Sequence, residues 1–275
     1  MPDIDVIKAT KNPLTIPLLV ESLHACGVQP GQTILVHTAL SKLGWIVGGV
    51  QAYIMALLEA VGEQGTIMMP TQTGDLTDPK EWQNPPIPES WWQLHRDYAP
   101  AYDPQVTPTR GMGRVPELFR VWPGVQRSAN PVVSFAAHGP NADYLLADHS
   151  LTDELGEQSP LGKLYALDGH VLLIGVDHFN NTSLHLAEYR TDYPGKSMMK
   201  TGSPMLVDGQ RQWVEYEVLN TGGDDFGLLG KAFDQAHDVR VQRIGNADVR
   251  FFHQRPLVDF ACKWMAANRT ATGDA

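Results

Sequence analysis

DGHVLLIGVDHFNNTSLHLAEYR, residues 168–190, is the stretch of sequence from which we predict the fold. Its segment 171–176 is an apolar run with a β-branched bias, which is typical of a buried strand. A short polar loop follows, and Thr182 or Ser183 can serve as the N-cap of a helix. Because open α/β sheets bind ligands where a strand runs into a helix, we expect an α/β fold with a functional site at the end of this strand.

His185 and Glu188 are the candidate catalytic residues of this helix. They are three positions apart, so both side chains project from one helical face. An imidazole that is held near a carboxylate can act as a general base near neutral pH. The alternative is a structural histidine in a polar helix, with Glu188 an ordinary acidic residue of the first turn. The spacing alone leaves both interpretations open.

Strands and helices alternate through the first 190 residues. The segments 32–36, 65–70, 132–139 and 171–176 have the character of strands, and 14–27, 49–62 and 182–190 that of helices. This order predicts a three-layer α/β sandwich, with a mostly parallel central sheet that helices cover on both faces. Later strands, among them 211–219, are expected to extend the sheet antiparallel and make it mixed. We expect a single domain over 1–275, with a frayed tail at 268–275.

Residues 74–110 interrupt this alternation with a segment that is rich in proline and tryptophan. A long segment of this kind inside a compact chain is usually functional or disordered, and its aromatic residues argue against disorder. We therefore expect an ordered insertion over the mouth of the active site. Trp91, Trp92 and Tyr98 would either pack this insertion down or line a pocket.

The formal net charge of the 275 residues is -10, which argues against nucleic acid as a partner. The charge is compatible with a cationic small molecule, although acidic surfaces also serve solubility alone. No apolar run reaches the roughly 20 residues needed to span a bilayer, and we expect no signal peptide. Cys26 and Cys262 stand in apolar surroundings as inert thiols, so we expect a cytoplasmic protein.

The segment HTALSKLG, residues 37–44, joins the first predicted strand to the next helix. Hydroxyls, small residues and free backbone N–H groups before a helix suit an anion such as a phosphate. A capped turn that uses serine and glycine is the alternative interpretation. Neither GxGxxG nor GxxxxGK[ST] occurs in the chain, so a Rossmann dinucleotide site and a P-loop are not supported.

A metal centre is a second possibility for the predicted strand ends. His37, His138, His185 and Glu188 have the residue types of a zinc site. However, the chain contains no HExxH, HxH or CxxC motif, so we expect no metal and keep a metal-dependent hydrolase as an alternative. A covalent acyl-enzyme is also not indicated, since no GxSxG motif is present and no cysteine lies beside a histidine.

Six segments together resemble the aminoglycoside 3-N-acetyltransferase family, the antibiotic N-acetyltransferase type that is distinct from the GNAT superfamily. They are HTALSKLG (37–44), MPTQTGDLTDP (69–79), TPTRGMGRVPELFR (107–120), RSANPVVSFAAHGPNA (127–142), QSPLGKLYALDGHVLLIGV (158–176) and NTSLHLAE (181–188). The resemblance runs from about residue 14 to residue 265. It implies transfer of an acetyl group from acetyl-CoA to the 3-amino group of a 2-deoxystreptamine aminoglycoside.

The resemblance also implies where acetyl-CoA binds. The segment 37–44 is similar to the family's His-Ser-Ser-Leu-Ser-x-Leu-Gly, which lies along the pantetheine and phosphates, and Ala39 departs from it by lacking a hydroxyl. The blocks at 109–114 and 127–135 resemble further parts of the cofactor groove, where Arg114 or Arg127 would meet phosphates or form a surface ion pair. The implied cofactor-binding residues are His37, Thr38, Ser41, Leu43, Gly44, Thr73, Arg114, Ser134 and Phe135.

By the same resemblance, His185 is the general base of a direct transfer in a ternary complex. Glu188 would orient its imidazole, with Glu157 as a rival carboxylate. Thr38 or Thr73, with backbone N–H groups, would stabilise the tetrahedral oxyanion. A CoA-dependent acyltransferase of some other small amine is the nearest alternative. We expect a monomer or a homodimer.

Four acidic residues are the candidates for binding the ammonium groups of the substrate: Asp75, Asp78, Asp103 and Glu157. Asp75, Asp78 and Asp103 lie in the predicted insertion, where acidic side chains are equally suited to cap turns. The sequence does not decide between these two roles.

Overall fold

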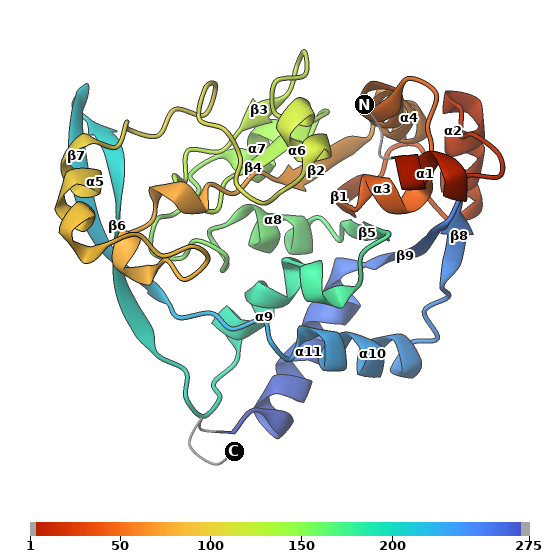
Figure 1. The fold of residues 1–275 in the computed structure, drawn as a ribbon. Coiled ribbons are helices and arrows are strands. Elements are labelled where there is room, and N and C mark those ends of the chain that lie inside the picture. The colour runs from red at the N-terminus through yellow and green to blue at the C-terminus, as the bar shows by residue number, and fades with distance from the viewer. Residues whose placement is uncertain (1–3, 271–275) are drawn as a thin grey trace.

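A seven-stranded mixed sheet forms the centre of the computed structural model, which describes residues 4–270 (Figure 1). The strand order is β3-β4-β2-β1-β5-β9-β8. The strands are β1 (Thr33–Thr38), β2 (Thr66–Pro70), β3 (Gln126–Arg127), β4 (Phe135–His138), β5 (His170–Ile174), β8 (Gln242–Ile244) and β9 (Ala247–His253). β1 is parallel to β2 and β5, whereas β4 and β9 are antiparallel to their inner neighbours. β3 and β8 reverse direction again, so five of the seven strands point the same way, as the sequence predicted.

Successive side chains of the central strands pack alternately into two separate hydrophobic cores, one on each face of the sheet. On β1, Ile34 and Val36 face one core and Leu35 faces the other, and each is at most 1% exposed. This is the period-two alternation of a strand that is buried on both faces. Each such aliphatic side chain stabilises the fold by about 1.5–3 kcal/mol when it leaves water.

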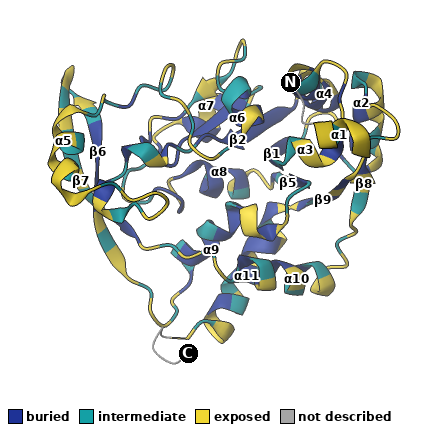
Figure 2. Ribbon diagram, viewed as in Figure 1, coloured by how far each residue is buried: buried dark blue, intermediate teal, exposed yellow. Residues whose placement is uncertain are grey.

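Helices cover both faces of the sheet, which confirms the expected three layers (Figure 2). The first face packs against α2 (Ile16–Ala25), α4 (Gly49–Val61) and α6 (Arg114–Phe119). The second face packs against α7 (Ala142–Leu146), α8 (Pro160–Ala166), α9 (Ser183–Arg190), α10 (Phe226–Ala236) and α11 (Gln254–Asn268). Two short helices, α1 (Ile4–Ala9) and α3 (Leu40–Leu43), lie next to each other near β1 (Figure 1).

A long hairpin stands apart from the central sheet. It consists of β6 (Met198–Val207) and β7 (Gln210–Leu219), joined by Asp208 and Gly209. Both joining residues have positive φ, 50° and 75°, as a type I′ turn requires. The expectation that 211–219 would extend the main sheet was therefore wrong. The sequence did not reveal the partner strand because Gly202 and Pro204 interrupt its pattern.

Residues 74–110 pack against this hairpin. They contain η1 (Gly74–Leu76), η2 (Pro79–Glu81), η3 (Glu89–Trp91) and α5 (Trp92–Tyr98), and Figure 1 shows α5 beside β6 and β7. The Tyr102 N–H donates to the Pro204 carbonyl over 2.9 Å, and Arg211 Nε donates to the Ala99 carbonyl over 3.0 Å. The segment is thus folded onto the hairpin, and its later part also contacts β3, where Arg127 donates to the Thr107 carbonyl.

The C-terminal end of the described chain differs from its prediction. Asn268 is the last residue of α11, and Arg269 forms ion pairs with Glu188 and Asp225. The expected frayed tail was therefore wrong for these two residues, while 271–275 lie outside the described part. Within residues 4–270, no helix is both long and apolar enough to cross a bilayer.

Candidate functional site

The carboxyl ends of β2, β1 and β5 meet at one edge of the sheet, because these three neighbours are parallel. β1 ends at Thr38 and β5 at Ile174, and these two residues are register partners. The Ala39 N–H donates to the Ile174 carbonyl over 2.9 Å, which ties the first turn to the end of β5. α3 and α9 follow β1 and β5 at this edge, so both predicted turns open to the same side of the molecule.

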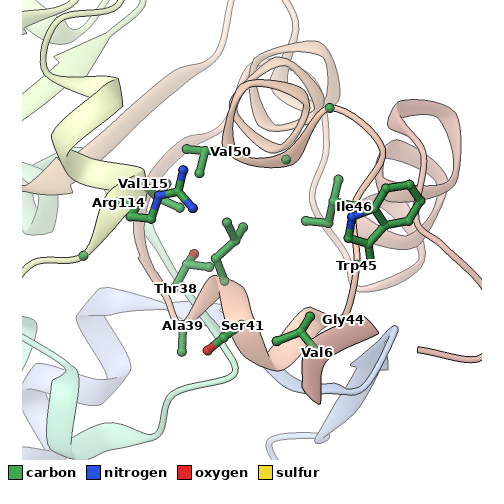
Figure 3. A pocket seen from close by; sticks show the side chains of 14 residues that line it. Val6, Thr38, Ala39, Ser41, Gly44, Trp45, Ile46, Val50, Arg114 and Val115 are labelled. Atoms are coloured by element: carbon green, nitrogen blue, oxygen red, sulfur yellow. The ribbon is translucent and has the colours of Figure 1, made fainter. Parts of the chain in front are cut away.

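The larger cavity at this edge has a volume of about 550 Å³ and is mostly apolar (Figure 3). We call it the cofactor cavity, after the ligand that the family resemblance implies for the 37–44 segment. It is lined by Val6, Thr38, Ala39, Leu40, Ser41, Gly44, Trp45, Ile46, Gly48, Gly49, Val50, Gly113, Arg114 and Val115. In Figure 3, Arg114 and Trp45 stand on opposite sides, and Thr38 and Ser41 contribute hydroxyls. Gly48 (φ 86°) precedes α4 without a side-chain cap, so the positive end of that helix dipole faces this cavity.

A smaller cavity of about 240 Å³ adjoins the first, and we call it the acceptor cavity, after the amine substrate that the resemblance implies beside His185. It shares two lining residues with the cofactor cavity, Thr38 and Val115. Its polar lining side chains are His37, Thr38, Gln72, Asn180, Asn181, Thr182 and His185. The two cavities therefore meet at the end of β1, and the predicted base belongs to the second of them.

His185 is held by the carboxylate that the sequence proposed. Its Nδ1 lies 2.6 Å from Glu188 Oε2, and its ring packs against Phe226 with 4.9 Å between ring centroids. Because an ionised carboxylate only accepts hydrogen bonds, Nδ1 carries the proton. Nε2 is then the basic nitrogen of an imidazole that lines the acceptor cavity. The rival carboxylate Glu157 instead binds Arg190, with 2.9 Å between Oε2 and Nη2.

Glu188 is fully buried, and its second oxygen is also paired. Oε1 accepts the Gly222 N–H over 2.9 Å and Arg269 Nη1 over 2.7 Å. Arg269 in turn donates to both carboxylate oxygens of Asp225, each over 2.8 Å. Burial would lower the pKa of Arg269, but the hydrogen bonds to Asp225 and Glu188 outweigh it and raise that pKa. Sequence reasoning missed Arg269, because 81 residues separate it from Glu188 and no motif links them.

His37 faces α9 rather than the cofactor cavity. It follows Val36 on β1, so its side chain points to the second face of the sheet, and its Nε2 lies 3.3 Å from Thr182 Oγ1. Burial lowers the pKa of His37 to about 3. A neutral imidazole offers no charge to a phosphate, so the predicted cofactor role is not supported by this placement, and His37 lines the acceptor cavity instead.

The other predicted cofactor residues divide into two groups. Lining positions in the cofactor cavity are occupied by Thr38, Ser41, Gly44 and Arg114. The remaining four are internal: Leu43, Thr73, Ser134 and Phe135 are each at most 1% exposed. The Thr73 hydroxyl donates to the Pro131 carbonyl and the Ser134 hydroxyl to the Thr71 carbonyl, so neither is directed at a ligand. Arg127 is likewise occupied by carbonyls of neighbouring loops.

The four acidic candidates do not line either cavity. Each has a protein partner instead: Asp75 pairs with Arg110, Asp78 with Arg96, Asp103 with the Gln105 N–H, and Glu157 with Arg190. Asp78 also accepts the Lys80 N–H over 3.1 Å, so it caps a turn as Asp103 does. The structure therefore places these side chains in turns and ion pairs rather than at the site. Trp91, Trp92 and Tyr98 of the insertion also lie outside the lining of both cavities.

The histidines that suggested a zinc site do not lie together. His138 pairs with Ile67 near the start of β2, whereas His37 pairs with Leu173 near the end of β5. These pairings put His138 and His37 at opposite edges of the sheet. Among residues 4–270, no group of three or more His, Cys, Asp or Glu side chains is arranged to hold a metal ion.

An α/β protein with two joined cavities and a carboxylate-held imidazole beside them has the construction of an acid–base enzyme. The family model for aminoglycoside 3-N-acetyltransferase matches residues 35–266. The chain therefore belongs to the aminoglycoside 3-N-acetyltransferase family, as its six segments predicted.

Named relatives agree over nearly the whole chain. The SPbeta prophage-derived aminoglycoside N(3')-acetyltransferase-like protein YokD of Bacillus subtilis (strain 168) is 46% identical over 264 residues, which are 96% of each chain. Its crystal structure superposes with a TM-score of 0.93 over 96% of this chain and 97% of YokD. Aminoglycoside N(3)-acetyltransferase VII of Streptomyces paromomycinus is 35% identical, covering 96% of each chain. The structure described as AAC-IIIb binary with CoASH is 31% identical, with a TM-score of 0.83 over 96% of this chain and all of that one.

Proposed function

We propose that this protein transfers an acetyl group from acetyl-CoA to a primary amine of a small cationic acceptor. The first candidate is the 3-amino group of a 2-deoxystreptamine aminoglycoside. One observation carries the proposal: the cofactor cavity and the acceptor cavity meet at Thr38, and His185 lines the second cavity. Two substrates can then meet at the end of β1, with a base beside the acceptor.

The cofactor cavity has the features that a CoA thioester needs. Its apolar walls, with Trp45 on one side, suit the pantetheine and the adenine base. Arg114 and the uncapped N-terminus of α4 supply positive charge for phosphates, and Ser41 supplies a hydroxyl. The relative AAC-IIIb is described with CoASH bound, which supports the same ligand here.

In the proposed reaction, His185 Nε2 accepts a proton from the acceptor ammonium, which frees the nitrogen lone pair. The amine nitrogen then attacks the thioester carbonyl carbon, a C–N bond forms, and the C–S bond breaks. The attacking nitrogen loses a second proton to solvent as the C–S bond breaks, and the proton on Nε2 passes to the departing thiolate, so the products are the amide, the CoA thiol and one released proton. Glu188 stabilises the charged imidazolium through the 2.6 Å contact with Nδ1.

The oxyanion of the tetrahedral intermediate has one candidate side-chain donor at the junction. Thr38 lines both cavities, and its hydroxyl lies 2.7 Å from the Tyr53 hydroxyl. When Tyr53 donates to Thr38, the Thr38 proton is free to point at the developing oxyanion. Thr73, the other predicted donor, is bonded internally and does not line either cavity.

Acetylation of a less highly charged amine is the second candidate, and the lining of the acceptor cavity favours it. Gln72 and Asn180 supply amides there, whereas among residues 4–270 no carboxylate belongs to that lining. A polycationic aminoglycoside would gain more from carboxylates than from amides. A small acceptor with one amine and several hydroxyls suits this chemistry.

A thiol-release assay tests the proposal. Acetyl-CoA is offered with gentamicin-class drugs, neomycin-class drugs and a panel of small hydroxylated amines, with His185→Ala as the control. CoA release with a deoxystreptamine drug, absent in the control, supports the first candidate, and release only with the small amines supports the second. No release with any amine would contradict an N-acetyltransferase.

A further inference from the structure

We propose that Arg269 is a positioning residue that fixes the orientation of Glu188 and thereby of the His185 imidazole. The inference rests on the proposed function, since it gives Arg269 a role in holding the base. Arg269 lies three residues beyond 266, where the family match ends.

The geometry of Glu188 leaves one oxygen for the imidazole. Oε1 is engaged twice, by the Gly222 N–H at 2.9 Å and by Arg269 Nη1 at 2.7 Å. Oε2 therefore faces His185 Nδ1 at 2.6 Å. Glu188 is 0% exposed, so water does not replace a lost partner without reopening the core. Without Arg269, Oε1 would keep only a single N–H donor, and the carboxylate could rotate.

Arg269 is itself held on several sides. Its Nε and Nη2 donate to the two oxygens of Asp225, and Nη2 also donates to the Gly222 carbonyl over 2.8 Å. Its guanidinium lies over the Tyr193 ring, 4.7 Å from the centroid. The planar fork of an arginine can span a carboxylate and a carbonyl on one side and Glu188 on the other, which the single ammonium of lysine cannot.

The charges of Glu188, Asp225, Arg269 and His185 balance when His185 is protonated in the proposed reaction. Two carboxylates, Glu188 and Asp225, face the guanidinium, and His185 adds a second positive charge when it accepts a proton. Among residues 4–270, Tyr193 is a further titratable side chain in contact with Arg269. Removing Arg269 leaves the Glu188 carboxylate beside the imidazole without its cationic partner, which favours the protonated ring. The base would then be available only at higher pH.

Arg269→Gln tests this role, with Arg243→Gln as the matched control, because Arg243 forms an exposed ion pair with Asp248. We expect Arg269→Gln to lower kcat about tenfold, to leave the KM for acetyl-CoA unchanged, and to move the rising limb of kcat/KM to higher pH. Arg269→Lys, which keeps the charge, should restore the position of that limb more than it restores kcat. An unmoved pH profile in Arg269→Gln, or equal losses in Arg243→Gln, would overturn the inference.

A proton resonance gives a second readout that needs no substrate. A strong Nδ1–H bond to a carboxylate produces a low-field signal, which we expect in the wild-type protein and in Arg243→Gln but not in His185→Ala. In Arg269→Gln and Arg269→Lys the signal should broaden or shift, while circular dichroism verifies folding. A wild-type protein with this signal but no transferase activity would refute the proposed function alone, and a signal unchanged in Arg269→Gln would refute the positioning role alone.

Discussion

The two turns at the carboxyl edge of the sheet are built in opposite ways. In the turn after β1, the helix start at Gly48 has no side-chain cap, and the backbone borders a cavity of about 550 Å³. In the turn after β5, Asp177 accepts the Phe179 N–H over 2.9 Å, and Asn181 accepts the Ser183 N–H over 3.2 Å. The first turn thus leaves polar groups at the cavity, whereas the second uses the side chains of Asp177 and Asn181 internally, before the helix that carries His185.

The largest expected effect comes from removing the His185 imidazole, which lies in the helix after the second turn. His185→Ala should lower kcat by about 10²-fold or more, the range of general-base catalysis, while CoA binding is kept. Steady-state kinetics and calorimetric titration with CoA measure the two quantities separately. Near-normal turnover would remove His185 from the role of base, and lost CoA binding would mean that the two turns are not independent.

His37, between the two turns, should make stability depend on pH. Its pKa falls from an ordinary 6.5 to about 3 on burial, so the unfolded chain binds more protons between these values. The stability that it contributes is therefore complete above pH 6.5 and is lost as the pH falls toward 3, by up to about 1.4 kcal/mol per pH unit. Urea unfolding at several pH values should show a shallower slope in His37→Gln. The same slope in His37→Gln as in the wild type would contradict the burial effect, and His138→Gln at the opposite edge is the control.

A smaller change is expected in the first turn. Ser41→Ala removes one hydroxyl from the cofactor cavity and should raise the KM for acetyl-CoA by roughly two- to fivefold, as one hydrogen bond of about 0.5–1 kcal/mol implies. kcat should stay the same, because Ser41 does not line the acceptor cavity. If kcat fell and the KM for acetyl-CoA were constant, the claim that the first turn serves cofactor binding alone would be wrong.

The smallest effect is expected outside both turns. Asp103→Asn should change the acceptor KM by less than about twofold, because Asp103 caps a turn at Gln105 and lines neither cavity. Initial rates over a range of acceptor concentrations measure this. A tenfold rise in the acceptor KM would show that this loop reaches the substrate after all.

The sequence predicted the parts of the molecule that depend on local pattern. The buried strands, the helix after Thr182 and the three-residue spacing of His185 and Glu188 all follow from periodicity, and the structure contains each of them. The 37–44 segment does join β1 to the next helices, and three of the residues that the family resemblance singled out there, Thr38, Ser41 and Gly44, line the cofactor cavity, whereas Leu43 is internal.

The features that the sequence did not predict depend on contacts between residues that are far apart in the chain. Arg269 contacts Glu188, which lies 81 residues earlier in the chain. β6, the partner of β7, contains glycine and proline, so its sequence does not show the pattern of a strand. Acidic residues in a polar loop look alike whether they bind a ligand or cap a turn, so Asp78 and Asp103 were ambiguous until their partners were known. The lowered pKa of His37 likewise results from its burial, and no local sequence pattern shows that this histidine is buried.

A crystal structure with CoA bound tests the central claim most directly, through the distance between the CoA sulfur and His185 Nε2. A base within about 3 Å of an amine that attacks from about 3–3.5 Å requires the sulfur to lie within roughly 7 Å of Nε2. We predict the sulfur beside Thr38, where the two cavities meet. A sulfur held elsewhere, with no open path between it and the His185 ring, would contradict the account.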